Sequence, residues 1–591
     1  MIPPSNLDWA GALIDVLVAG GARHAVVSPG SRNTPVVLAL HRLARQGRVT
    51  LHDVLDERSA GFFGLGLARM TGQPVLLSCT SGSAGAHYLP AIVEASHARL
   101  PLIALTADRP PELQGVGAPQ TTPQADFFAG HVRFRADPGP PDEGTALEEM
   151  TALGTRALDE AMGARPGPVH LNLPFRKPLW DDETHGASQP VPTRARRPSP
   201  ALSPGDLEGL VARTMAATRG VIVCGPGDLG DVGHRRADGS RALQQSVGRL
   251  ADALGWPVLI DGASSLRAAP EIPGAITVAD TLSRAEGLAG ALAPDLVLRV
   301  GPIPTSTPLR RWLAHHGAGR TVLLDAAGER QDPDHLDAEV IAADPAVTLA
   351  ALAERVGAEP CRAPTTWRSA WVAAAEAVSR GQSPMLEEGP LWAGSTARIL
   401  AETLPPGGLL HVASSLAVRA LDSFGGAMAA DTLVTANRGV NGIDGTLATA
   451  FGQATLHAGP TAVLLGDLAF LHDVGSLATL GAHADRGPMV VLVLDNSGGG
   501  IFDHLPISEH PTAYEPHFVT PPRADVARLG EALARHFVSA TAPADLRETL
   551  GIAFSRPGLT VIHVPFTREQ DLQQHRRLWA VGQTAIQEVL P

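Results

Sequence analysis

The chain reads Thr461-Ala-Val-Leu-Leu-Gly-Asp467 and, further on, Val490-Val-Leu-Val-Leu-Asp-Asn-Ser-Gly-Gly-Gly500, two apolar runs that each end in polar residues. Each run has the length and composition of a short buried strand, and the roughly 20 residues between them suit a crossover helix. The two strands are therefore expected to be parallel, with their carboxyl ends at the same edge of a sheet. Small ligands bind at that edge.

Asn496 follows Asp467 by 29 residues, and both stand where a predicted strand ends. Asp467 offers a carboxylate, Asn496 a side-chain carbonyl and Gly498 a backbone carbonyl. An all-oxygen set of this kind suits Mg²⁺ or Ca²⁺, with phosphate oxygens and water completing the shell. Taken alone, Gly466-Asp467 after a strand is more often an ordinary turn, and Asn496-Ser-Gly-Gly-Gly500 is more often an ordinary loop. Together, in this order and at this distance, they predict a site for a metal-bridged diphosphate.

Composition limits the remaining possibilities. The 591 residues exceed what one core can enclose and should divide into about three or four domains. A net charge of -13 with no Lys/Arg run argues against nucleic acid as a partner. Three widely spaced cysteines give no disulfide framework, and neither a signal peptide nor a membrane span is recognisable, so we expect a cytoplasmic protein. Lys177 is the only lysine, which makes Schiff-base catalysis improbable.

The pattern along the chain predicts an α/β protein. Residues 1–180 alternate apolar runs with stretches of helical spacing, as expected for a parallel sheet with helices on both faces. A Pro-rich segment without periodicity, 181–203, reads as a linker. A second set of βα units covers 204–355, and a third α/β domain covers 391–570 and contains the diphosphate motif. The stretch 356–390 between them has little signal.

Six sequence blocks then narrow the interpretation. They are Ser28-Pro-Gly-Ser-Arg-Asn-Thr-Pro35, Asp56-Glu-Arg-Ser-Ala-Gly61, Thr80-Ser-Gly-Ser-Ala84, Leu105-Thr-Ala-Asp-Arg-Pro-Pro-Glu-Leu113, Asn437-Arg-Gly-Val-Asn-Gly-Ile-Asp-Gly445 and Gly498-Gly-Gly-Ile-Phe502. In this order they resemble the 2-succinyl-5-enolpyruvyl-6-hydroxy-3-cyclohexene-1-carboxylate synthase family, thiamine diphosphate enzymes of menaquinone biosynthesis. The resemblance spans all three domains. It implies a transferase that decarboxylates 2-oxoglutarate and joins the product to isochorismate, with Mg²⁺ or alternatively Mn²⁺, as a homodimer or a dimer of dimers.

The resemblance also assigns roles to residues. Glu57 is the expected catalytic residue, because the family uses a glutamate at this place to exchange a proton with N1′ of the aminopyrimidine. Without the resemblance, Glu57 would be interpreted as a carboxylate that complements a helix N-terminus. Ile443 is expected to support the bent form of the cofactor. The residues expected to bind cofactor are Glu57, Thr80, Ser81, Gly82, Ile443, Gly466, Asp467, Leu468, Asn496, Gly498, Ile501 and Phe502, with Asp467, Asn496 and Gly498 as metal ligands.

Arginines dominate the expected substrate site, because both substrates of the family are dicarboxylates and a guanidinium matches a carboxylate in two places. A surface ion pair is the usual role of any one arginine, but these stand at predicted strand ends inside the matching blocks. The expected substrate-binding residues are Ser31, Arg32, Arg109, Gln120, Ser415, Arg419, Arg438, Phe502 and Leu505.

The sequence departs from the family pattern at two positions. Thr307 stands where a lysine is common, and Arg310 or Arg311 could replace its charge; Pro119 stands where an asparagine is frequent. These departures keep a second interpretation open, another thiamine diphosphate-dependent 2-oxoacid decarboxylase or carboligase with a different acceptor. A catalytically silent subunit with the same fold is a third, but Glu57, Asp467 and Asn496 are all present.

Overall fold

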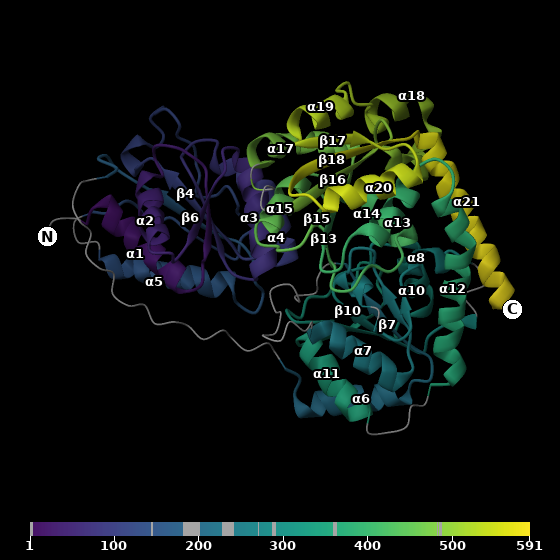
Figure 1. The fold of residues 1–591 in the computed structure, drawn as a ribbon. Helices are drawn as coiled ribbons and strands as arrows, with labels where there is room; N and C mark the ends of the chain where they lie inside the picture. Colours follow the sequence, from purple (N-terminus) through teal and green to yellow (C-terminus); the bar gives the residue numbers. More distant parts are fainter. Residues whose placement is uncertain are drawn as a thin grey trace. The chain divides into compact units, whose positions relative to one another are not determined.

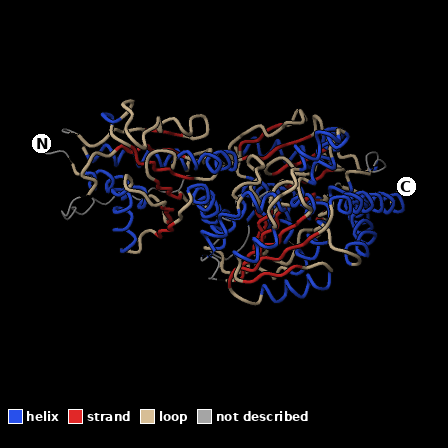
Figure 2. The backbone as a smooth tube through the Cα atoms, turned by 90° about the horizontal axis from the view of Figure 1, so that it is seen from above, coloured by secondary structure: helices blue, strands red, loops and turns tan. Residues whose placement is uncertain are grey.

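The computed structural model describes residues 4–142, 146–180, 201–226, 242–269, 271–285, 291–357, 363–481, 483 and 487–590. Within these residues the chain forms three six-stranded sheets in which every strand pairing is parallel. Helices cover the sheets, as the ribbon and the tube both show (Figures 1 and 2). The predicted fold class is thus confirmed. Most of the expected linker, 181–200, lies outside the described residues.

The first sheet has the strand order β2-β1-β3-β4-β6-β5. Its strands are β1 (His24–Val27), β2 (Thr50–Asp53), β3 (Val75–Cys79), β4 (Leu102–Asp108), β5 (Phe134–Ala136) and β6 (Val169–Pro174). The helices that follow or precede them are α1 (Asn6–Ala19), α2 (Thr34–Arg45), α3 (Glu57–Thr71), α4 (Leu89–Ala98) and α5 (Leu147–Ala161). Apolar side chains of α1, α2, α5 and the sheet form one fully buried core.

The second sheet has the order β12-β11-β10-β7-β8-β9. Its strands are β7 (Gly220–Cys224), β8 (Val258–Ile260), β9 (Ala275–Ile276), β10 (Leu296–Val300), β11 (Thr321–Asp325) and β12 (Glu339–Ala342). Its helices are α6 (Pro204–Ala216), α7 (Ala242–Leu254), α8 (Ala279–Leu282), α10 (Thr307–His316) and α11 (Pro345–Val356). Separate cores lie on the two faces of this sheet, as expected for strands that are apolar on both sides.

The third sheet, β14-β13-β15-β16-β18-β17, repeats the strand order of the first. Its strands are β13 (Leu409–Val412), β14 (Leu433–Thr435), β15 (Thr461–Gly466), β16 (Pro488–Asp495), β17 (His536–Ser539) and β18 (Gly558–Pro565). The helices before and between these strands in the sequence are α13 (Ala393–Thr403), α14 (Leu416–Phe424), α15 (Thr446–Ala454), α16 (Asp467–His472), α17 (Val474–Leu480), α18 (Pro511–Tyr514), α19 (Val526–Leu533) and α20 (Pro543–Phe554). The single crossover helix expected between β15 and β16 is in fact two short helices, α16 and α17.

The stretch with little sequence signal contains the 23-residue helix α12 (Thr365–Glu387). Gly381 and Pro384 lie inside this helix and obscure its pattern, because both residues disfavour helices. Helix α12 packs beside α21 (Arg568–Val589), which extends well beyond residue 570 (Figure 1). None of the helices in the described part of the chain is long and apolar enough to cross a membrane.

Contacts divide the chain into two compact units. Unit 1 comprises residues 1–198, 437–456 and 473–483, and unit 2 comprises 199–436, 457–472 and 484–591. Helix α15 belongs to unit 1 because it packs closely on α3. A Cβ at Gly66 would lie 2.2 Å from the Thr449 carbonyl oxygen, and a Cβ at Gly452 would lie 2.2 Å from that of Phe63. Glycine at both positions therefore permits backbone contact between the two helices.

Candidate active site

The predicted site residues fall into two groups, one in each unit. The first half-site, in unit 1, lies at the carboxyl ends of β1, β3 and β4 and contains Arg32, Thr80, Ser81, Arg109 and Gln120. The second half-site, in unit 2, lies at the carboxyl ends of β15 and β16 and contains Asp467, Asp495, Asn496 and Gly498. Parallel strands explain both, because each turn that follows a strand in a parallel sheet opens at the same edge.

Arg109 connects three segments of the first half-site. Its guanidinium donates to the Ser81 hydroxyl and, at 3.3 Å, to Oε1 of Gln120. Gln120 returns a hydrogen bond of 3.4 Å to the Ser81 carbonyl and has a φ of 56°, a conformation unusual for a residue other than glycine. Asp108 fixes the start of the turn by accepting the Arg109 backbone N–H at 2.7 Å. Arg109 thus joins the turn after β3 to the segment that contains Gln120.

Arg32 lies beside this group. Its backbone N–H donates to the Thr80 hydroxyl at 3.2 Å and its Nη1 to the Phe175 carbonyl at 2.7 Å. Burial, and then the charge of Arg109, lower the pKa of the Arg32 guanidinium, and Asp108 opposes them. Within the described residues neither Arg32 nor Arg109 forms an ion pair with a carboxylate. Two like charges therefore share one end of the sheet, while Ser31, at the start of the same turn, is exposed.

Glu57 is the first residue of α3, where Asp56 caps the helix by accepting the Arg58 backbone N–H at 2.9 Å. Its side chain is half-buried beside the end of β3. Burial raises the pKa of the Cys79 thiol, and the Glu57 carboxylate raises it further. Phe62 and Phe63, one turn into the same helix, are 5% and 0% exposed. Buried aromatic side chains thus follow Glu57 on its own helix, but they point away from it.

The loop 437–445 packs directly on α3. Gly445 has a φ of 61°, and a Cβ there would lie 2.0 Å from a ring carbon of Phe62. Ile443 is half-buried two residues earlier. The flanking glycine is therefore required by close approach, which is the reason for singling out Ile443 in the sequence.

Glu94 on α4 is a residue that the sequence analysis missed. Its carboxylate is 2% exposed and accepts the backbone N–H groups of Gly439 and Val440 at 2.8 and 2.9 Å. These two hydrogen bonds fix the backbone directly after Arg438. A single glutamate in the apolar run Ala91-Ile-Val-Glu-Ala95 was the available signal, since a carboxylate is buried only when it is paired.

Asp467 organises the second half-site. It is 2% exposed, and its two oxygens accept the backbone N–H groups of Leu468 and Gly498, both at 2.7 Å. Burial raises the pKa of Asp467 to about 7, and the neighbouring Asp495 contributes to the increase. The contact with Gly498 joins the turns after β15 and β16, which the sequence had predicted to meet.

Asp495 is a second missed residue, although it directly precedes Asn496. Its oxygens accept the His563 Nε2 hydrogen bond at 2.9 Å and the Ser497 backbone N–H at 3.1 Å. Burial alone would raise the pKa of Asp495, but these hydrogen bonds hold it below its ordinary value. Two carboxylates are thus held close together in a largely buried place, an arrangement that a bound cation stabilises.

The glycine-rich turn after Asn496 has a backbone that only glycine tolerates. Gly498 has a φ of 135°, and a Cβ there would lie 2.6 Å from the Val519 carbonyl oxygen. The Gly499 N–H donates to the same carbonyl at 2.8 Å. Asn496 is 8% exposed, and a Cβ at Gly500 would lie 2.3 Å from its amide nitrogen. The Gly498 carbonyl accepts the Gly500 N–H at 2.9 Å and keeps a second lone pair for a ligand, and carboxylate, amide and carbonyl oxygens together fit a hard divalent cation.

Two further parts of unit 2 carry predicted substrate residues. Arg419 on α14 donates to the Ser415 carbonyl at 2.8 Å, and Ser415 precedes the helix with φ 70° and ψ -135°. Phe502 lies in the short turn Gly500–His504 with its ring against Phe518, and Leu505 follows, 47% exposed. Thr307 begins α10, and Arg310 already pairs with Asp334, which disfavours Arg310 as the replacement for the family's lysine.

Comparison with known proteins identifies the family. Residues 8–129 match the model described as "Thiamine pyrophosphate enzyme, N-terminal TPP binding domain", and residues 426–564 match the corresponding C-terminal TPP binding domain. The 2-succinyl-5-enolpyruvyl-6-hydroxy-3-cyclohexene-1-carboxylate synthase of Chloroflexus aurantiacus is 38% identical over 590 residues, covering 98% of this chain and 96% of the relative. The synthase of Myxococcus xanthus is 39% identical over 599 residues, with 97% of each chain covered.

The chain belongs to this synthase family. Its fold is also that of more distant thiamine diphosphate enzymes. Benzoylformate decarboxylase from Polynucleobacter necessarius superposes with a TM-score of 0.68 at 18% identity, covering 95% of this chain and 98% of that one. A putative thiamin diphosphate-dependent enzyme from Mycobacterium smegmatis gives 0.67 at 19% identity, with 95% and 99% covered. The resemblance inferred from six sequence blocks is confirmed, as is thiamine diphosphate as the family's cofactor.

Proposed function

We propose that this chain catalyses the reaction of its family: decarboxylation of 2-oxoglutarate and addition of the remaining four carbons to isochorismate, which gives 2-succinyl-5-enolpyruvyl-6-hydroxy-3-cyclohexene-1-carboxylate and CO₂. The observation that carries the substrate assignment is the pair Arg32 and Arg109. Both guanidiniums lie at one end of the first sheet without a carboxylate partner in the described residues. A dicarboxylate ligand would supply the missing negative charge.

The second half-site would hold the diphosphate end of the cofactor through Mg²⁺, or Mn²⁺ in its place. Asp467, Asn496 and the carbonyl of Gly498 are the proposed ligands. Gly466 ends β15, Leu468 lies on α16, and Ile501 and Phe502 lie in the short turn Gly500–His504. Thiamine diphosphate supplies, when bound, a nucleophilic carbon and an electron sink for decarboxylation. The chain's own contribution is a preformed set of oxygen donors, with the Asp467 carboxylate oriented by two backbone hydrogen bonds.

Glu57 would hold and exchange the proton at N1′ of the aminopyrimidine. It stands at the N-terminus of the buried helix α3, and its side chain is itself half-buried, which limits the access of water. Restricted water keeps a shared proton between two groups rather than in solvent, which favours acid-base catalysis. Thr80, Ser81 and Gly82 would contact the cofactor from the end of β3, and Ile443 from the loop 437–445.

Substrate carboxylates would be held by Ser31, Arg32, Arg109 and Gln120 of the first half-site, by Arg438, and by Ser415 and Arg419 on α14, with Phe502 and Leu505 as apolar walls. We propose a homodimer or dimer of dimers as the active form, in which one chain's first half-site serves another chain's second half-site. A cytoplasmic location is consistent with Cys79 and Cys224, both of which are free and buried.

The direct test uses purified protein with thiamine diphosphate, Mg²⁺, 2-oxoglutarate and isochorismate, with the product identified by mass spectrometry. Pyruvate is the control donor, because it lacks the distal carboxylate that the arginines would bind. Preference for pyruvate, or absence of the isochorismate adduct, would favour another thiamine diphosphate-dependent carboligase over the proposed synthase.

A further inference from the structure

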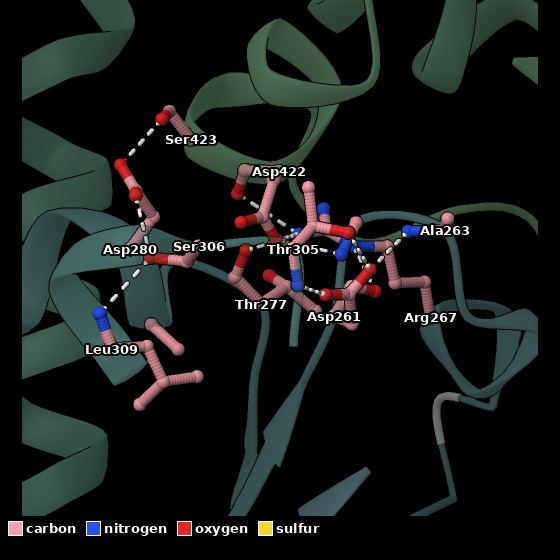
Figure 3. Close-up of polar contacts among 12 residues, drawn as sticks. Asp261, Ala263, Arg267, Thr277, Asp280, Thr305, Ser306, Leu309, Asp422 and Ser423 are labelled. Atoms are coloured by element: carbon pink, nitrogen blue, oxygen red, sulfur yellow. Dashed lines mark hydrogen bonds and ion pairs between the residues drawn. The ribbon is translucent and has the colours of Figure 1, made fainter. Parts of the chain in front are cut away.

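Helix α14 carries predicted substrate residues at its beginning and a buried polar cluster at its end. The cluster comprises Asp261, Arg267, Asp280, Asp422 and Ser423, and it joins the third sheet's helix to the turns and helices around the second sheet (Figure 3). All five residues belong to unit 2. Figure 3 shows the Asp422 and Ser423 side chains pointing from the helix toward these partners.

Asp422 makes the first connection. It is 4% exposed, and its Oδ1 accepts the Gly262 backbone N–H at 2.6 Å. Arg267, whose side chain is fully buried, donates to the Asp422 carbonyl at 2.9 Å and to the Gly426 carbonyl at 2.8 Å. A Cβ at Gly262 would lie 2.6 Å from the Asp422 Cα. Backbone therefore meets backbone at this point, and the end of α14 has little freedom to move.

Ser423 makes the second connection. Its hydroxyl donates to Oδ2 of Asp280 at 2.6 Å, while Oδ1 of Asp280 accepts the Ser306 hydroxyl at 2.7 Å. Ser306 is the N-cap of α10, so one carboxylate ties α14 to a helix of the second sheet. Hydrogen bonds to an ionised carboxylate are stronger than those between neutral groups.

The placement of these acidic groups has a cost that needs a reason. Asp422 stands in the last turn of α14, where the helix dipole disfavours a negative charge, and burial raises its pKa well above the ordinary value. Apolar packing would hold a helix end at a lower desolvation free energy than buried carboxylates do. The directional hydrogen bonds of Asp422 and Ser423, in contrast, define where the end of the helix lies.

The beginning of α14 is where an exact position would matter. Ser415 adopts φ 70° and ψ -135°, a region that residues other than glycine rarely occupy and that persists only where the surroundings enforce it. Arg419 is one turn into the helix and donates a hydrogen bond to the Ser415 carbonyl at 2.8 Å. Burial lowers the pKa of Arg419, while Asp422, Asp280 and Asp261 favour its charged form.

We propose that Ser423, Asp422 and their partners Asp280, Gly262 and Arg267 are positioning residues that fix α14 so that Ser415 and Arg419 meet a substrate carboxylate. The second sheet thereby takes part in substrate binding without touching substrate. This inference rests on the proposed role of Arg419. A shift of about 1 Å in a positioning element is enough to change catalysis substantially, which gives a remote hydrogen bond a measurable effect.

Ser423→Ala is the most informative variant, because it removes one hydroxyl and leaves Arg267 and Asp422 paired. Its matched control is Ser246→Ala: Ser246 is equally buried on α7 and donates to the Ala242 carbonyl at 2.7 Å. The measurements are KM and kcat for 2-oxoglutarate and isochorismate, thiamine diphosphate affinity and the melting temperature. We expect Ser423→Ala to raise KM for at least one carboxylate substrate by at least about threefold with unchanged cofactor affinity, and Ser246→Ala to leave both unchanged.

A double-mutant cycle separates positioning from general stability. If Ser423 acts largely through Arg419, the pair Ser423→Ala and Arg419→Ala should raise KM by clearly less than the product of the two single effects, with any remainder due to Ser415. Additive effects, or a Ser423→Ala variant that loses only melting temperature, would overturn the inference while leaving the role of Arg419 intact. A silent Arg419→Ala would instead remove the assignment of Arg419 to the substrate, and the positioning role with it.

Discussion

The two half-sites are built on sheets with the same strand order and have opposite electrostatic character. At the carboxyl end of the first sheet, Arg32 and Arg109 bring positive charges together. At the carboxyl end of the third sheet, Asp467 and Asp495 bring carboxylates together. In each place the fold holds like charges near one another, and a ligand of opposite charge would relieve the repulsion. The backbone topology provides an edge, and the turn residues decide what it binds.

The pKa values express this difference. The raised pKa of Asp467 and the lowered pKa of Arg32 both have burial as the main cause and a like charge as a second cause. Sites that bind charged ligands are expected to show such shifts, because their charges are arranged for the ligand and not for the empty protein. Removal of one charge at a time should consequently affect cofactor and substrate separately.

The largest effect is expected in the second half-site. Asp467→Ala removes the carboxylate that orients the Gly498 turn, so tight thiamine diphosphate binding should be lost while the fold remains. Isothermal titration with Mg²⁺ present measures the affinity. Asp525→Ala is a suitable control, since Asp525 caps α19 through the Arg528 N–H at 3.0 Å and pairs with the exposed Arg528 side chain, away from the predicted site residues. Unchanged cofactor affinity in Asp467→Ala would exclude the metal role.

Glu57→Gln should separate activation from binding in the first half-site. The amide keeps the shape of the side chain but cannot exchange a proton, so cofactor affinity should change little while proton exchange at the reactive thiazolium carbon slows by about 10²- to 10⁴-fold. Acid-quenched NMR follows this exchange directly. Asp56→Asn, which alters the cap of the same helix, serves as the control. Exchange at the normal rate in Glu57→Gln would show that Glu57 takes no part in activating the cofactor and only complements the helix N-terminus.

Mixing the two inactive variants tests whether the half-sites of different chains work together. If a site combines the first half-site of one chain with the second half-site of its partner, an exchanged equimolar mixture of Glu57→Gln and Asp467→Ala should recover about a quarter of the normal activity. Half of the dimers would then be mixed, and each would contain one intact site. Activity that stays at background after verified subunit exchange would contradict this arrangement.

Loss of a single arginine should have a smaller effect. Arg32→Ala, Arg109→Ala, Arg419→Ala and Arg438→Ala should each lower kcat/KM at least about tenfold, on the scale of 1.4 kcal/mol per decade, with little change in cofactor affinity. Arg42→Ala is the matched control, since Arg42 is already paired with Asp15 at 2.8 Å. If all four variants resemble the control, the dicarboxylate assignment fails.

The smallest predicted effect concerns stability outside both half-sites. Burial raises the pKa of Asp571 on α21 to about 7, against about 3.9 in an unfolded chain. Between these values the native state retains a proton that the unfolded state has lost, so this group lowers stability as pH rises from about 4 to about 7. Asp571→Asn does not titrate and still accepts the Ala393 N–H. Its melting temperature relative to the unmutated protein should therefore increase over this range.

An increase of at least about 2 °C in that difference is expected. The neighbouring His504 and His575 have pKa values lowered to about 4, mainly by burial, and they act in the opposite direction in both proteins. Asp503 is also common to both. A melting-temperature difference that is constant between pH 4 and pH 7 would contradict the predicted titration.

Local sequence patterns predicted much of the fold and part of the candidate site. Apolar runs predicted the strands, and the alternation of strands with helical stretches predicted parallel sheets, because both depend on residues close in sequence. The proximity of Asp467 and Gly498 was predicted because the carboxyl ends of parallel strands lie at the same edge of a sheet. Helix α12 was missed because Gly381 and Pro384 weaken its pattern, and its contact with α21 provides the stabilisation that its own sequence does not show.

The sequence by itself determined the fold class, the family and the residues on which the chemistry is expected to depend, since these follow from short motifs whose spacing has a direct physical meaning. Only the tertiary structure decided which groups lie next to them: Glu94 under the loop after Arg438, Asp495 beside Asp467, and Asp280 under α14. Each is one acidic residue among 60. Nothing local distinguishes such a residue, because its hydrogen bonds and desolvation are created by segments that become neighbours only when the chain folds.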